Sequence, residues 1–111
     1  MSSYKDDKRI RPRMKREFVM GVRNERGLNA VYTVDVSYGG VKVGSPLLLL
    51  PLGGQVDIVF DKRGEKFAFP GRVVREGGYY YIDRISRSVK TYFISIDDEH
   101  YSKFVIENYF I

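Results

Sequence analysis

Apolar residues recur at every second position along much of this chain, which is the spacing of half-buried β-strands. Residues 30–36 show the pattern most clearly, and alternation predicts that Val31, Thr33 and Asp35 share one face of a strand. Further strands are predicted at 18–22, 41–43, 56–60, 67–74, 79–85 and 89–94, with a buried edge or crossing segment at 47–50. Short turns separate them at 24–29, 38–40, 51–54, 61–65 and 76–78. Six or seven short strands with such close turns predict an antiparallel sandwich or barrel.

The end of the chain changes to a helical period. Asp97 is predicted to be the N-cap, and the acidic residues after it suit the positive end of a helix dipole. Apolar residues then recur at helical spacing, at Tyr101, Phe104, Val105 and Tyr109. An amphipathic helix is therefore predicted, packed on the β-domain or closing one mouth of a barrel.

The 111 residues divide into three predicted parts of a single domain. Residues 1–16 form a polar, flexible arm, in which Pro12 directs the residue before it away from helix. Residues 17–95 form the β-barrel domain, and residues 96–111 form the C-terminal helix.

The positive charge of the chain is concentrated in the arm. Residues 1–16 carry seven basic and two acidic side chains, so they account for the whole net charge of +5. Residues 17–111 carry twelve of each sign. A basic arm on a neutral body suits either an anionic partner or a solvated tail, and charge alone leaves both interpretations open.

Several kinds of chemistry lack the residues that they need. The chain has no cysteine and a single histidine, His100, so neither a catalytic triad nor a thiolate metal site is predicted. The acidic run 97–99 is explained by the start of the helix, because adjacent helical residues do not converge on a metal. No phosphate-binding loop with its Lys-Ser/Thr pair is present. We therefore expect a binding module without cofactor or metal rather than an enzyme.

No stretch of the sequence predicts a membrane segment. The longest purely aliphatic run, Leu47–Leu50, is far too short to cross a bilayer, and the N-terminus has no apolar signal-peptide core. The sequence thus predicts a cytoplasmic protein that does not insert into membranes.

Two short motifs stand out in the order in which they occur. Arg9 and Arg13 form an RxxxR pair in the arm, and twenty-two residues later the chain reads Asp35-x-Ser37-x-x-Gly40. Each has an ordinary explanation when taken alone. Arginines solvate an arm, aspartate and serine bond their own backbone in turns, and glycines permit a hairpin.

Together the two motifs resemble those of the PilZ domain family. The passages "LLPLGGQVDIVF" and "FPGRVVR" also resemble that family, and the likeness runs from about Lys8 to Arg87. It implies a six-stranded antiparallel β-barrel that binds cyclic di-GMP, a bacterial second messenger. By the motif match, ligand binding is assigned to Arg9, Arg13, Asp35, Ser37 and Gly40, with Lys8, Arg11 and Gly39 as second-rank candidates. The family position before RxxxR, here Lys8, influences whether one or two ligand molecules bind, and this sequence leaves the stoichiometry open.

The residue types suit this ligand. An arginine can bind the O6/N7 edge of guanine, bind phosphate, or stack its planar guanidinium on the base. The carboxylate of Asp35 can accept hydrogen bonds from the N1–H and N2–H₂ edge of guanine, and Ser37 can add one more. Gly40 is expected to let the ligand approach the backbone.

The resulting hypothesis is a receptor that orders its arm around cyclic di-GMP and relays this change to an unidentified downstream protein. One alternative is a small β-barrel that binds single-stranded nucleic acid, which the basic arm and the nine tyrosines would suit. The neutral body makes nucleic acid a less favoured partner. Another alternative is a PilZ-like protein–protein adaptor without ligand binding, and the presence of all five motif residues argues against it.

Overall fold

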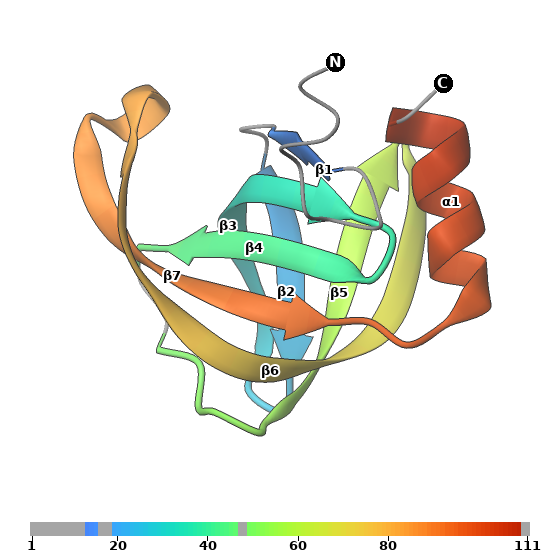
Figure 1. Ribbon diagram of the computed structural model, residues 1–111, viewed down its shortest axis with the longest axis horizontal. Helices are drawn as coiled ribbons and strands as arrows, with labels where there is room; N and C mark the ends of the chain where they lie inside the picture. The colour runs from blue at the N-terminus through green and yellow to red at the C-terminus, as the bar shows by residue number, and fades with distance from the viewer. Residues whose placement is uncertain (1–12, 16–18, 47–48, 110–111) are drawn as a thin grey trace, which may run out of the picture.

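The computed structural model describes residues 13–15, 19–46 and 49–109, and the side chains from residue 19 onward. Within these ranges the elements run in the order β1 (Arg13–Lys15), β2 (Val19–Asn24), β3 (Gly27–Ser37), β4 (Gly40–Ser45), β5 (Gln55–Lys62), β6 (Glu65–Ile82), a 3₁₀ turn η2 (Asp83–Ile85), β7 (Arg87–Ser95) and α1 (Glu99–Tyr109) (Figure 1). No helix in these ranges is long and apolar enough to cross a membrane.

Six strands form a closed ring of antiparallel pairs. The order is β3–β2–β5–β6–β7–β4, and β4 pairs back onto β3. Because the ring is closed, each of its six strands pairs with a neighbouring strand on both sides. The predicted all-β, six-stranded antiparallel fold with a C-terminal helix is therefore confirmed.

Strand β1 is an addition to the ring and comes from the predicted arm. It pairs with residues 35–37 of β3, on the same edge along which β2 pairs with residues 27–32. The rest of the predicted arm, residues 1–12 and 16, lies outside the described residues.

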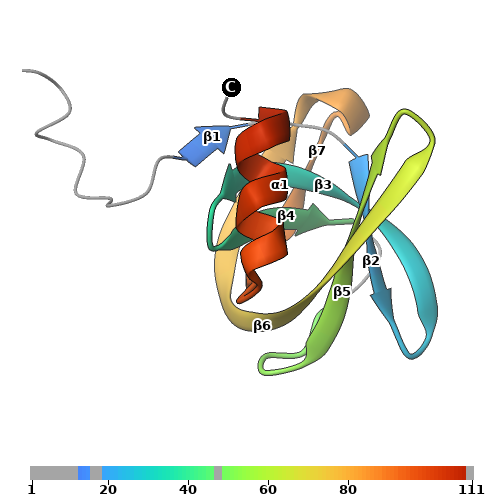
Figure 2. The ribbon, with the colours of Figure 1, turned by 90° about the vertical axis from the view of Figure 1, so that its right-hand side faces the viewer.

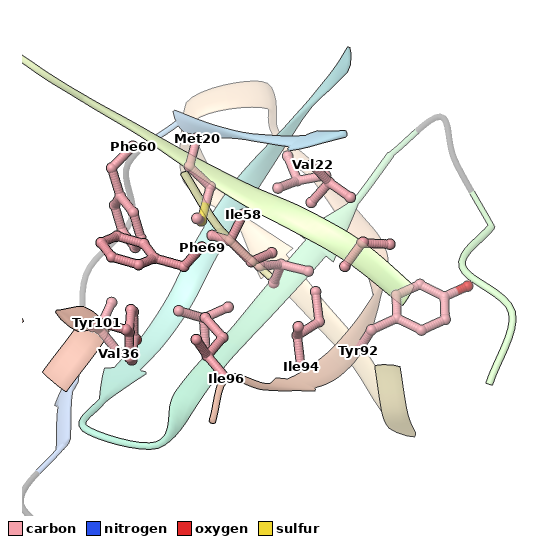
Figure 3. Packing of buried hydrophobic residues seen from close by; sticks show 14 of the residues in the cluster. Met20, Val22, Val36, Ile58, Phe60, Phe69, Tyr92, Ile94, Ile96 and Tyr101 are labelled. Atoms are coloured by element: carbon pink, nitrogen blue, oxygen red, sulfur yellow. The ribbon is translucent and has the colours of Figure 1, made fainter. Parts of the chain in front are cut away.

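Helix α1 covers one end of the ring, where it lies across the strands in Figure 2. The stripe predicted from the sequence, Tyr101, Phe104, Val105 and Tyr109, is buried. The ring of Phe104 lies 5.0 Å from that of Phe60 and 5.3 Å from that of Phe69, measured between centroids. Figure 3 shows Phe60, Phe69 and Tyr101 beside the aliphatic side chains of the core. Burial of the stripe fixes the helix on the ring, since each such side chain contributes about 2 kcal/mol.

The helix begins one residue later than the sequence predicts. Asp98, rather than Asp97, is the N-cap, because its Oδ1 accepts a hydrogen bond of 2.8 Å from the backbone N–H of His100. The N–H of Ile96 still donates to the carbonyl of Gly39, at 2.9 Å. The first carbonyl of the helix is that of Asp98, which accepts hydrogen bonds from the N–H groups of Tyr101 and Ser102.

Two other local predictions differ from the structure. Residues 76–78 do not form a turn, because β6 runs without interruption from Glu65 to Ile82 and only shifts its register against β7 there. Of the predicted buried segment 47–50, the described residues Leu49 and Leu50 lie outside any strand, and Leu49 is 79% exposed whereas Leu50 is buried.

Candidate ligand-binding site

A β-bulge in β3 decides the orientation of Asp35. Thr33 lies opposite Val43 and Asp35 lies opposite Lys42, so Val34 is an extra residue between these two pairs. The extra residue reverses the alternation of faces. Thr33 is fully buried, whereas Asp35 is half-buried on the outer face. The prediction that Asp35 shares a face with Thr33 is thus wrong, and the bulge is the physical reason.

A cavity of about 250 Å³ lies on this outer face, over the end of β3, the start of β4, the middle of β6 and the end of β7. Asp35, Ser37, Gly39 and Gly40 contribute to its wall, so the structure brings together the predicted site residues of this segment. Arg75 and Phe93, which belong to strands distant from this segment in the sequence, also line the cavity. The described residues contain no cluster of three or more side chains suited to hold a metal ion.

The turn between β3 and β4 is fastened to helix α1 by hydrogen bonds. The hydroxyl of Tyr101 is shared between the carbonyl oxygens of Ser37 and Gly40, each at 2.9 Å. The hydroxyl of Ser102 donates to the carbonyl of Tyr38 at 3.0 Å. Within the turn, the hydroxyl of Ser37 also donates to the carbonyl of Gly40, at 3.3 Å. Helix α1 therefore sets the backbone geometry of the turn that carries Ser37 and Gly40.

Tyr101 stays a hydrogen-bond donor at any ordinary pH. Burial is the main cause that raises the pKa of its hydroxyl well above the usual value, and the nearby hydroxyl of Tyr109 raises it further. A neutral phenol retains the hydrogen that it shares between the two carbonyl groups.

Gly40 has a structural role inside the protein. A Cβ at this position would overlap the carbonyl oxygen of Ile94 in β7 and would lie 3.2 Å from the Cα of Ser95. Glycine is therefore required for β4 and β7 to approach each other here. The predicted approach of a ligand to Gly40 remains a prediction.

Comparison with known proteins identifies the family of this chain. The sequence model of the PilZ domain matches residues 7–105. The chain belongs to the PilZ domain family. No match is found among curated protein sequences.

Solved structures, among them two PilZ domains, share the fold. The PilZ domain of CeSA from a cellulose-synthesising bacterium is 22% identical, with a TM-score of 0.63 over 89% of this chain and 95% of that one. The PilZ domain of YcgR from Escherichia coli, solved with cyclic di-GMP, is 10% identical, with a TM-score of 0.71 over 94% and 90%. The Bacillus subtilis inhibitor of motility MotI/DgrA is 12% identical, with a TM-score of 0.65 over 91% of this chain and 48% of that one.

In this PilZ domain, the strand register brings the backbone of the arm to the turn. Arg13 of β1 pairs with Ser37 of β3, and Lys15 pairs with Asp35. On the other edge of β3, Ser37 pairs with Gly40. The second arginine of RxxxR thus lies at a register position beside the DxSxxG motif, although the two are twenty-two residues apart. Lys8, Arg9 and Arg11 lie outside the described residues.

Three residues that line the same PilZ cavity are absent from the predicted site, namely Lys42, Arg75 and Phe93. The alternation of the predicted strand 41–43 places Lys42 on the face opposite to its valine neighbours, so this residue could have been proposed. Arg75 and Phe93 meet only because β6 pairs with β7. No local sequence pattern indicates that pairing.

Removing the Tyr101 hydroxyl by Tyr101→Phe should lower the free energy of unfolding by about 1–2 kcal/mol, because a part-buried and a buried carbonyl group each lose a donor. Urea denaturation measures this difference. Tyr79→Phe is the matched control, since Tyr79 is 73% exposed and should change stability by less than about 0.5 kcal/mol. Equal effects of the two substitutions would show that the bonds from α1 to the turn add no stability.

Proposed function

We propose that this PilZ domain is a receptor that binds cyclic di-GMP between its N-terminal arm and the outer face of the ring. The observation that carries the proposal is the strand register, in which Arg13, Ser37 and Gly40 occupy adjacent positions on β1, β3 and β4. The bulge at Val34 adds the Asp35 carboxylate to the same wall of the cavity.

The proposed roles follow from the chemistry of the groups. Cyclic di-GMP carries two negative phosphates and two guanines. Arg9 and Arg13 bind the phosphates and the O6/N7 edges of guanine, which lysine side chains cannot bind in the same bidentate way. Asp35 accepts hydrogen bonds from the opposite edge of a guanine, and the Ser37 hydroxyl adds a further bond. Gly40 has no side chain and therefore leaves space for the ligand at the cavity wall.

The arm supplies the proposed response to the ligand. Seven basic side chains lie in residues 1–16, so a dianionic ligand offsets their mutual repulsion and draws residues 1–12 towards the turn, beside which β1 already lies. Ordering the arm costs free energy, and affinity should therefore be roughly micromolar and should fall as salt increases. The altered surface is then recognised by a downstream protein. As a receptor for a bacterial second messenger, the protein would act in the cytoplasm.

Isothermal titration of the full chain with cyclic di-GMP tests the binding. We expect a saturable heat signal whose affinity weakens with added salt. The absence of heat at high micromolar ligand would overturn the proposal. Hydrogen exchange tests the relay, because slower exchange in residues 1–16 on addition of ligand is expected. Unchanged exchange with saturable heat would reject the relay while retaining the receptor.

A pull-down from a bacterial lysate, with and without cyclic di-GMP, tests the downstream step. The receptor hypothesis predicts a protein whose capture depends on the ligand. Capture that is identical with and without the ligand would support an adaptor that works through protein contacts alone.

A further inference from the structure

An aromatic ring lies between two cations in the cavity that Asp35 and Ser37 also line. The Nζ of Lys42 lies 5.0 Å from the ring centroid of Phe93, and the Cζ of Arg75 lies 4.1 Å from it. Phe93 is half-buried and Arg75 is exposed. All three residues line the cavity, so this group faces the same space as Asp35 and Ser37.

The register of four strands produces this arrangement. Asp35 pairs with Lys42, Lys42 pairs with Phe93, and Phe93 pairs with Arg75, so one row crosses β3, β4, β7 and β6. The sheet spacing is about 4.8 Å per strand, and therefore the row runs across the whole floor of the cavity. The motif residue stands at one end of the row and Arg75 stands at the other.

A bulge in β6 brings Arg75 into this row. Val73 pairs with Ile94 and Arg75 pairs with Phe93, so Val74 is an extra residue, as Val34 is in β3. Val73 is fully buried, and the bulge directs Arg75 to the outer face, where it meets Phe93. Gly77 lies beside the ring, and a Cβ there would lie 2.5 Å from Thr91 Oγ1 and 3.0 Å from Phe93 Cε2. The backbone is thus shaped to leave room for the ring.

We propose that Arg75, supported on Phe93, is a ligand-binding residue that stacks on a purine base of a cyclic dinucleotide, with Lys42 beside it to bind a phosphate. A guanidinium is planar and stacks on aromatic rings and on bases, so one face can rest on Phe93 while the other receives the base. A lysine at position 75 would retain the charge but not the plane. The inference deepens the proposed function of the site and rests on it.

The test compares Arg75→Lys with Arg84→Lys, a matched change at an exposed arginine of η2 that does not line the cavity. In calorimetric titration with cyclic di-GMP, Arg75→Lys should bind roughly tenfold more weakly and Arg84→Lys should bind as the unchanged protein does. The change in guanine ultraviolet absorbance on binding should be smaller in Arg75→Lys. The charge is unchanged in this variant, so a smaller change would report the loss of stacking.

Phe93 tests the support of the guanidinium. Phe93→Leu should weaken binding, and Phe93→Tyr, which retains the ring, should restore it. Equal affinities and absorbance changes for the unchanged protein and Arg75→Lys would overturn the inference while leaving the proposed function intact. If the unchanged protein does not bind cyclic di-GMP, the proposed function itself fails. Should Phe93→Leu not fold, the Arg75→Lys result decides the question alone.

Discussion

Replacing Arg13 with alanine should weaken the binding of cyclic di-GMP by at least about a hundredfold, to the point where calorimetry detects none. Arg13 occupies the position in β1 that pairs with Ser37, at the centre of the proposed site. A guanidinium that makes two charge-assisted hydrogen bonds to a phosphate or guanine contributes about 3 kcal/mol or more. That free energy corresponds to a factor of at least about a hundred in the dissociation constant.

The control for this prediction is Lys5→Ala, which removes the same unit of charge from the arm at a position outside the RxxxR pair. It should change the affinity less than about twofold at physiological salt, because exposed charges at a distance are screened. Equal losses from the two variants would indicate general electrostatic attraction by the arm and would contradict a specific site at Arg13.

Much of the fold could be predicted from alternation, because burial on one face imposes a period of two on most strands of the ring. The C-terminal helix was equally accessible, since its stripe, from Tyr101 to Tyr109, has the helical period and packs on the core. The start of the helix was predicted one residue early. Asp97 and Asp98 are both suitable N-caps by type, and in the structure it is Asp98 that accepts the first hydrogen bonds of the helix.

The site is harder to predict from the sequence than the fold, because two of its residues are oriented by β-bulges. At Val34 and Val74 one extra residue reverses the alternation, so Asp35 and Arg75 face outward where a regular strand would direct them inward. Whether an extra residue is accommodated depends on the partner strand, and a local pattern does not contain the partner. The glycines at 77 and 78 were predicted as a turn for the same reason, although they belong to an irregular stretch of one long strand.

The DxSxxG segment was interpreted as both a turn and a ligand site, and the structure gives it a third role in the packing of the ring. Ser37 and Gly40 present their carbonyl oxygens to Tyr101 of α1, while Gly40 lies against β7. The motif therefore lies where the ring, the helix and the cavity meet. A substitution there can change stability before it changes binding, and experiments on the motif must measure both.

Gly40→Ala should lower the free energy of unfolding by about 3 kcal/mol or more in the absence of any ligand. The new Cβ would overlap the Ile94 carbonyl oxygen, which belongs to a paired backbone strand and cannot move aside as a flexible side chain could. Relief requires β4 and β7 to separate, which breaks their hydrogen bonds and opens the buried core behind Val41. Urea denaturation of the ligand-free protein measures the loss.

Gly78→Ala is the matched control for this prediction, because a Cβ at Gly78 has no atom within 4 Å and its backbone needs no left-handed conformation. This change should be neutral or slightly stabilising, since alanine restricts the unfolded chain more than glycine does. If Gly40→Ala were as stable as Gly78→Ala but failed to bind cyclic di-GMP, the glycine would be required for the approach of the ligand rather than for the packing of β4 on β7. A large loss of stability without ligand would instead establish that the strand contact itself requires glycine at this position.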